Sequence, residues 1–72
     1  MPALTWDDAE YIALALAAKF PAQDPLAVRF TDLRKWVTEI EGFADDPHAS
    51  TEGRLEAIQM AWWEERQNAG TS

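Results

Sequence analysis

The stretch TDLRKWVTEIEG, residues 31–42, holds the pattern that decides the fold. Its apolar residues recur at the i, i+3, i+4 and i+7 spacing of one buried helix face: Leu33, Trp36, Val37 and Ile40. Thr31 can cap the start of this helix, and Gly42 can stop it. We therefore predict an amphipathic helix between these residues, with Trp36 in a structural role on its buried face.

A first helix is predicted upstream of this stretch. Thr5 and Asp8 have the spacing of a capping box, and acidic residues follow where the positive end of a helix favours them. Apolar residues then recur every four positions, at Ile12, Leu16 and Phe20. Because Pro21 ends the pattern, we expect this helix to run from about residue 7 to residue 19.

Two further signals flank the central helix. Before it, Asp24 and Pro25 predict one short turn over residues 25–28, because Asp caps helix starts and Pro suits the first helical position. After it, residues 43–49 are expected to form an acidic loop, because Pro47 disfavours helical geometry at the residue before it.

A third helix is predicted beyond the acidic loop, capped by Ser50 or Thr51 and ending before residue 69. Its inward stripe consists of Leu55, Ile58 and Trp62. The adjacent Trp63 points about 100° away from Trp62, so one of these two side chains is expected to be partly exposed.

These elements predict an all-α fold, a small three-helix bundle of helix-turn-helix character. We expect a single domain over residues 1–72, with an ordered core at about residues 4–67. The absence of cysteine excludes disulfides, thiolate metal ligands and a Cys nucleophile. No stretch approaches 18 consecutive apolar residues and no secretory signal is recognised, so we expect a cytoplasmic monomer that does not enter a membrane.

The negative charge of the chain is concentrated in its second half. The whole chain has a net charge of −7, and residues 39–65, with eight acids and one base, account for that same value. Such a field recruits cations and basic protein surfaces, and it argues against nucleic acid, whose phosphates need clustered Lys and Arg. Acidity that serves only solubility explains the composition equally well.

The residues offer little for catalysis. His48 is the single histidine, and no nucleophile can be assigned to it from the sequence. The three glycines are isolated, so a phosphate-binding loop is absent. We therefore expect a protein that is not an enzyme.

Two kinds of binding fit the acidic residues. As hard oxygen donors, five acids could converge where the second helix, the loop and the third helix meet, and bind a metal weakly: Glu39, Glu41, Asp45, Asp46 and Glu52. A solvated acidic face explains the same residues. An acidic surface with aromatic anchors could instead dock on a basic protein. The residues of that partner-binding surface would be Glu39, Glu41, Phe43, Asp45, Asp46 and Trp63.

Three motifs of the chain are distinctive: DPLAVRFTD at residues 24–32, EGFADDPHAS at 41–50 and LEAI at 55–58. Together with Trp36 and Trp62, they make the chain resemble the IscX family of iron-sulfur cluster assembly proteins. The resemblance extends over roughly residues 4–65, nearly the whole chain.

The resemblance implies a small acidic helical protein with a winged-helix-like fold. It also implies that this protein binds the cysteine desulfurase of the assembly machinery, at a site overlapping those of frataxin and ferredoxin. It also implies weak iron binding through acidic surface residues, namely Asp8, Asp24, Asp32, Glu39, Glu41, Asp45, Asp46, Glu52 and Glu56. Gly42 and Ala44 stand where family members have acids, so iron binding is expected to be weaker here.

From the charge and the resemblance together we predict a non-enzymatic adaptor that regulates the desulfurase and competes with frataxin-like partners. No cofactor is expected to bind tightly, and Fe(II) or Fe(III) would bind weakly. The alternative is a metallochaperone that delivers iron to the assembly site.

Overall fold

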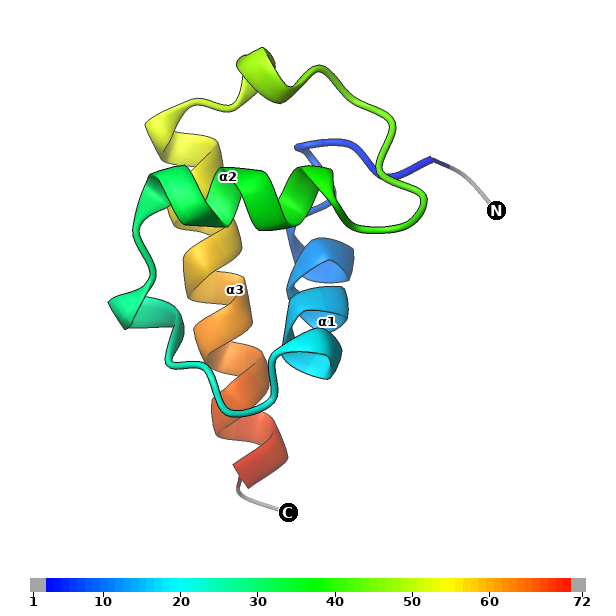
Figure 1. Cartoon of the computed structure of the whole chain (residues 1–72). Helices are drawn as coiled ribbons and strands as arrows, with labels where there is room; N and C mark the ends of the chain where they lie inside the picture. The colour runs from blue at the N-terminus through cyan, green and yellow to red at the C-terminus, as the bar shows by residue number, and fades with distance from the viewer. Residues whose placement is uncertain (1–2, 71–72) are drawn as a thin grey trace.

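The computed structural model describes residues 3–70 and confirms the all-α three-helix prediction. The helices are α1 (Ala9–Lys19), α2 (Phe30–Thr38) and α3 (Glu52–Gly70), with short 3-10 turns η1 (Pro25–Ala27) and η2 (Pro47–Ala49) (Figure 1). Within the described residues there is no strand. The counterpart of a wing is a single isolated β-bridge between Leu4 and Phe43.

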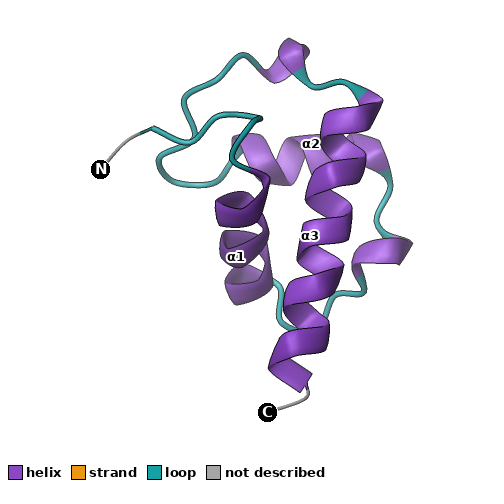
Figure 2. Ribbon diagram, turned by 180° about the vertical axis from the view of Figure 1, so that it is seen from behind, coloured by secondary structure: helices purple, strands orange, loops and turns teal. Residues whose placement is uncertain are grey.

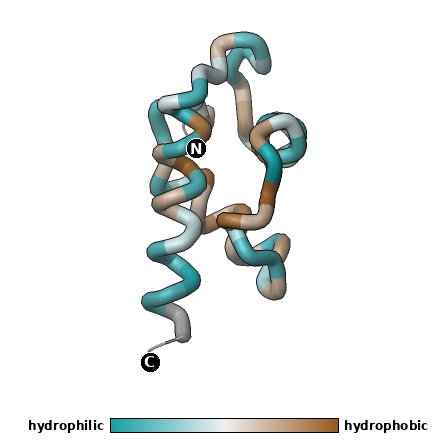
Figure 3. Tube along the Cα trace, turned by 90° about the vertical axis from the view of Figure 1, so that its left-hand side faces the viewer, coloured by the Kyte–Doolittle hydropathy of each residue, from teal (hydrophilic) through white to brown (hydrophobic). Residues whose placement is uncertain are grey.

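The helices form two layers. α1 and α3 lie side by side and run in the same general direction, and α2 crosses them on one side, as the front and back views show (Figures 1 and 2). α3 packs most extensively against α1. Apolar residues are interspersed with polar ones in the first part of α3, whereas residues 64–68 are all hydrophilic (Figure 3).

The core takes residues from all three predicted stripes. Its buried side chains are Trp6, Ile12, Ala13, Leu16, Val28, Leu33, Val37, Ile40, Leu55, Ile58 and Trp62. Trp36 is only half-buried, and its ring stacks on Phe20 with centroids 4.5 Å apart. Of the adjacent pair in α3, Trp62 is buried and Trp63 is half-exposed, which answers the question that the sequence left open.

The starts of α1 and α2 differ from the predicted positions. α1 begins at Ala9, because the Asp8 carboxylate accepts the Thr5 backbone N–H at 2.9 Å and holds the residues between them in a turn. Thr31 does not cap α2. Arg29 is extended (ψ 148°) and its carbonyl accepts the first helical bond, so α2 begins at Phe30.

The start of α3 follows the prediction, and its end does not. The Thr51 hydroxyl accepts the Arg54 backbone N–H at 3.2 Å, which identifies Thr51 as the cap. The helix continues through Gly70 rather than ending before residue 69. No proline intervenes, and a terminal glycine costs a helix only about 1 kcal/mol.

The predicted short turn η1 is fixed to one side of α3. The Asp24 carboxylate accepts the Leu26 N–H at 3.0 Å, as expected for a cap. From α3, the Gln59 side chain donates to the Pro25 carbonyl at 2.8 Å, and the Arg66 guanidinium donates to the Gln23 carbonyl, just before η1, at 2.7 Å.

Within residues 3–70, no helix has the length and apolar character needed to cross a membrane.

Candidate functional site

The acidic loop is held in place by the N-terminal segment of the chain. Leu4 donates its N–H to the Gly42 carbonyl at 2.9 Å, and the Leu4 carbonyl accepts the Ala44 N–H at the same distance. Gly42 has φ +92°, a backbone conformation that costs glycine little and other residues more. We call this pairing of residues 4–6 with residues 42–46 the clasp.

Trp6 is the central side chain of the clasp. It is 1% exposed, and its indole N–H donates to the Asp46 carbonyl at 2.7 Å. The Phe43 ring meets it edge-on, with centroids 4.9 Å apart. Phe43 thus anchors the loop, and because it is half-buried against Trp6 it is only partly available to a partner.

The Asp45 carboxylate points into the clasp. It accepts the Trp6 backbone N–H at 3.1 Å and the Asp46 backbone N–H at 2.8 Å. The bond from Trp6 is the main cause that lowers the pKa of Asp45 below its ordinary value, followed by the bond from Asp46. Arg54 adds to the lowering, and partial burial opposes it. Asp45 is therefore held as a carboxylate by the fold itself.

We expect Asp45→Asn to lower stability at neutral pH but not in acid. Because the folded pKa is depressed, the carboxylate's contribution is present above the unfolded pKa of about 3.9 and is lost as the pH falls through the folded pKa. Urea midpoints should therefore separate the two proteins above about pH 5 and converge toward pH 2. A constant difference over this range would contradict the role of the charge. Glu41→Gln, at an exposed position in the same loop, is the control.

Asp46 also has a local role in the loop. Its carboxylate accepts the His48 backbone N–H at 2.9 Å and caps η2. The side chain of Asp46 is nevertheless exposed, so a partner can still reach the carboxylate. The two adjacent aspartates therefore differ: the Asp45 carboxylate is bonded within the clasp, whereas Asp46 contributes its backbone carbonyl to the clasp and keeps its carboxylate exposed.

The predicted convergence of acids on a metal is wrong for the part of the chain that the structure describes. Among residues 3–70, no group of three or more Asp, Glu or His side chains is placed to hold a metal ion. Glu39 caps the C-terminal end of α2 and Glu52 begins α3, so they lie at opposite ends of the loop. Asp45 and Asp46 use their oxygens for backbone N–H groups. The metal-binding role of these residues and Glu41 stays a prediction.

Trp63 lies apart from the other predicted partner-binding residues. It is four positions after Gln59 and three before Arg66, so it shares the face of α3 that is fixed to η1. At about 1.5 Å per residue, it is roughly 16 Å along the helix from Glu52. A partner contact that includes the loop would therefore have to reach far along α3 to include Trp63.

Three acids follow the N-terminal part of the clasp in the sequence. Asp7 and Asp8 directly follow Trp6, which is bonded to the loop, so the clasp fixes where this acidic run begins, and Glu10 lies in the first turn of α1. Asp7 is partly offset by Arg54, whose guanidinium lies 3.5 Å away. A charge count along the sequence gives residues 1–38 a net charge near zero, so it does not reveal that these three acids follow a segment bonded to the acidic loop.

Trp6 is the residue that sequence reasoning missed. It lies outside every helix and shares no apolar stripe, and its hydrogen-bond partners are 39 and 40 positions away. Local patterns have no signal for such a contact. The only local hint was an aromatic residue next to the Thr5 cap signal.

A family model described as iron-sulphur cluster assembly matches residues 4–67. The chain belongs to this family, the IscX family. The resemblance drawn from the motifs is thereby confirmed. The matched range includes the clasp and every candidate site residue of this IscX-family protein.

A relative of this IscX-family protein occurs in Pseudomonas aeruginosa. It is 52% identical over 63 residues, which are 88% of the present chain and 96% of the relative. That relative is described as an uncharacterized protein. It extends the similarity over nearly the full length of both chains and adds no activity or partner.

Proposed function

We propose that this IscX-family protein is a cytoplasmic, non-enzymatic adaptor that docks on the cysteine desulfurase of iron-sulfur cluster assembly. In this role it binds as a monomer, competes with frataxin-like partners and regulates the delivery of sulfur. The observation that carries the proposal is the clasp, which holds an exposed acidic loop in one conformation within a chain of this family. We call the exposed acids Glu39, Glu41 and Asp46 the loop surface.

The loop surface is suited to steer a basic partner. Its three carboxylates are exposed, and a surface with complementary charge accelerates encounter and fixes orientation. Because the clasp already orders the loop, little conformational entropy is lost when a partner binds. The interaction should therefore weaken as salt screens the charges.

We expect Glu39→Gln combined with Glu41→Gln to weaken desulfurase binding about fivefold to tenfold at low salt. The wild-type complex should itself weaken severalfold from about 50 to 500 mM salt, as the Debye length falls from roughly 14 to 4 Å. The double variant should depend less on salt, because it has fewer charges to screen. Calorimetric titration against the desulfurase, with a chelator present, measures both effects.

Glu64→Gln combined with Glu65→Gln is the matched control for this prediction. It removes the same amount of charge near the far end of α3, away from the loop. Equal losses in the two double variants would show that net charge alone matters, which contradicts docking through the loop surface. An affinity that does not change with salt would contradict steering altogether.

Iron delivery is the alternative that the same titration tests. The described residues do not assemble a donor group for iron, so no observation of the structure favours this function. The adaptor proposal requires binding to persist in chelator. Binding that appears only after Fe(II) is added would replace the adaptor with the metallochaperone.

A further inference from the structure

The outward face of α1 carries two large exposed apolar side chains. Tyr11 is 66% exposed and Leu14 is 49% exposed. They lie three positions apart on one helix face, and exposed Ala18 extends this face by another turn. The opposite face, with Ile12 and Leu16, is buried in the core. The core therefore does not account for Tyr11 and Leu14.

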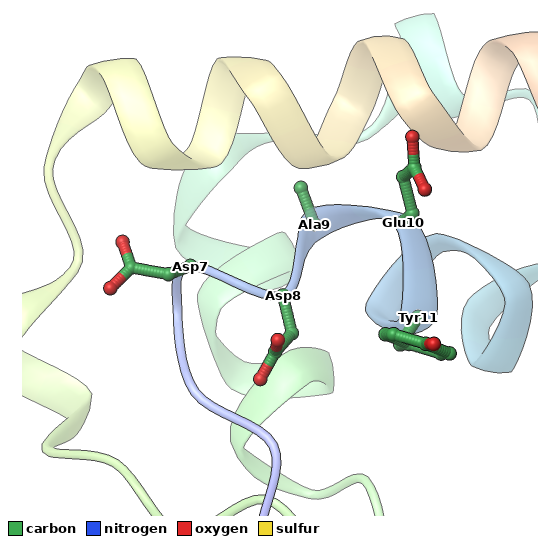
Figure 4. Close-up of a pocket in the computed structure, with 5 residues that line it drawn as sticks. All are labelled: Asp7, Asp8, Ala9, Glu10 and Tyr11. Atoms are coloured by element: carbon green, nitrogen blue, oxygen red, sulfur yellow. The ribbon is translucent and has the colours of Figure 1, made fainter.

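A shallow acidic recess opens at the start of this face. It has a volume of about 300 Å³ and is lined by Asp7, Asp8, Ala9, Glu10 and Tyr11 (Figure 4). The Asp8 carboxylate is held by Thr5, and Asp7 is partly paired with Arg54. Glu10 is exposed. Asp8 and Tyr11 point to one side of the chain, and Glu10 points to the other side, toward α3 (Figure 4). A carboxylate and an aromatic ring on the same side favour a Lys or Arg side chain, through charge-assisted hydrogen bonds and cation–π attraction.

The recess and the loop surface adjoin. Trp6 comes directly before the first residue that lines the recess, and its backbone N–H and indole N–H are bonded to Asp45 and Asp46 of the loop. A partner that covers the clasp thus meets the acids of the recess next, and Tyr11 and Leu14 of α1 after them. Tyr11 itself lines the recess, so the apolar face begins where the acids end.

We infer that Tyr11 and Leu14 are the apolar anchors of the docking surface, an inference that rests on the proposed function. The occupant is a basic protein surface that presents an Arg or Lys beside an apolar side chain. The cation enters the recess, and the apolar group packs on Leu14. This role replaces the one predicted for Trp63, which lies on the η1 side of α3.

A second copy of the chain fits this face less well. Two molecules that each carry a net charge of −7 repel one another. The exposed parts of two side chains are also small beside the roughly 800 Å² per partner of a standard stable interface. A basic partner adds electrostatic attraction that a second copy lacks.

The test is the double variant Tyr11→Gln and Leu14→Gln, titrated against the desulfurase in chelator at low and high salt. Glutamine is a good helix former, so thermal melting should be nearly unchanged. We expect binding to weaken about tenfold, as for loss of interface anchors. The salt dependence should match that of the wild type, because no charge is removed.

Leu26→Gln is the matched control, since Leu26 is 56% exposed on η1. Arg54 of α3 pairs with Asp7, just before α1, whereas Gln59 of α3 bonds to Pro25 of η1. These two positions are about 140° apart around α3, so Leu26 of η1 lies on a different side of α3 from the start of α1. The control should bind like the wild type. If Leu26→Gln lost as much affinity as the α1 double variant, the inference would be overturned, because any exposed apolar side chain would then affect binding regardless of its position.

The remaining outcomes separate this inference from the proposed function. Wild-type affinity in the α1 variant, with a loss in the Glu39 and Glu41 variant, overturns the inference and leaves the adaptor standing. Absence of desulfurase binding by the wild type overturns both. Sedimentation as a dimer that the α1 variant dissociates, with partner affinity unchanged, would overturn the inference and assign this face to self-association.

Discussion

Trp6→Ala is expected to destabilise the protein by about 3–5 kcal/mol, the range for truncating a buried tryptophan. Trp6 is 1% exposed, packs edge-on against Phe43 and bonds the Asp46 carbonyl. A domain of this size has about 5 kcal/mol or less to lose, so much of the variant should be unfolded at room temperature. Urea denaturation followed by circular dichroism measures the effect.

Trp6→Phe separates the hydrogen bond of Trp6 from its packing. Phenylalanine keeps most of the buried ring and removes the indole N–H that reaches Asp46 at 2.7 Å. We expect a cost of about 1–2 kcal/mol, from the lost bond and the reduced volume. If the Trp6→Ala variant were as stable as the wild type, that result would show that the clasp does not hold the N-terminal segment in place.

The second large effect is expected at Trp62, whose side chain is fully buried between α3 and the aromatic pair of Phe20 and Trp36. Trp62→Ala should also cost about 3–5 kcal/mol. Within the described residues, however, the Trp62 indole N–H has no hydrogen-bond partner. A buried unpaired donor costs roughly 1–3 kcal/mol.

Trp62→Phe should therefore cost less than Trp6→Phe, although the two alanine variants cost about the same. At Trp62 the substitution removes an unpaired donor along with some volume, whereas at Trp6 it removes a hydrogen bond. Paired urea titrations of the four variants test this order. If Trp62→Phe instead cost more than Trp6→Phe, the Trp62 indole N–H would have a hydrogen-bond partner in solution.

The predictions that held are those that depend on neighbours in the sequence. Asp24 caps η1 and Thr51 caps α3 because a cap and its N–H lie two or three residues apart. Leu33 and Val37 are buried because helical periodicity alone puts them on one face. Such signals predicted the three helices and most of the core.

What the sequence could not show is which distant segments meet, whereas the misplaced start of α2 and end of α3 are errors of local capping. Asp45 and Asp46 could be read from the sequence as loop acids, but only the structure shows that one of them supports Trp6. Likewise, the sequence left open which of Trp62 and Trp63 is partly exposed, and the direction of Trp63 follows from Gln59 and its bond to η1. These pairings join residues more than 30 positions apart, where local periodicity has no information.

The clasp also determines which end of the chain suits immobilisation or fusion. Residues 4–6 are bonded to the acidic loop, so a label on that side competes for space with the surface meant for a partner. Residue 70 ends α3 at the opposite end of the molecule (Figure 1). A carboxyl-terminal tag therefore leaves the docking surface free, whereas an amino-terminal tag would weaken apparent binding even in a correctly folded protein.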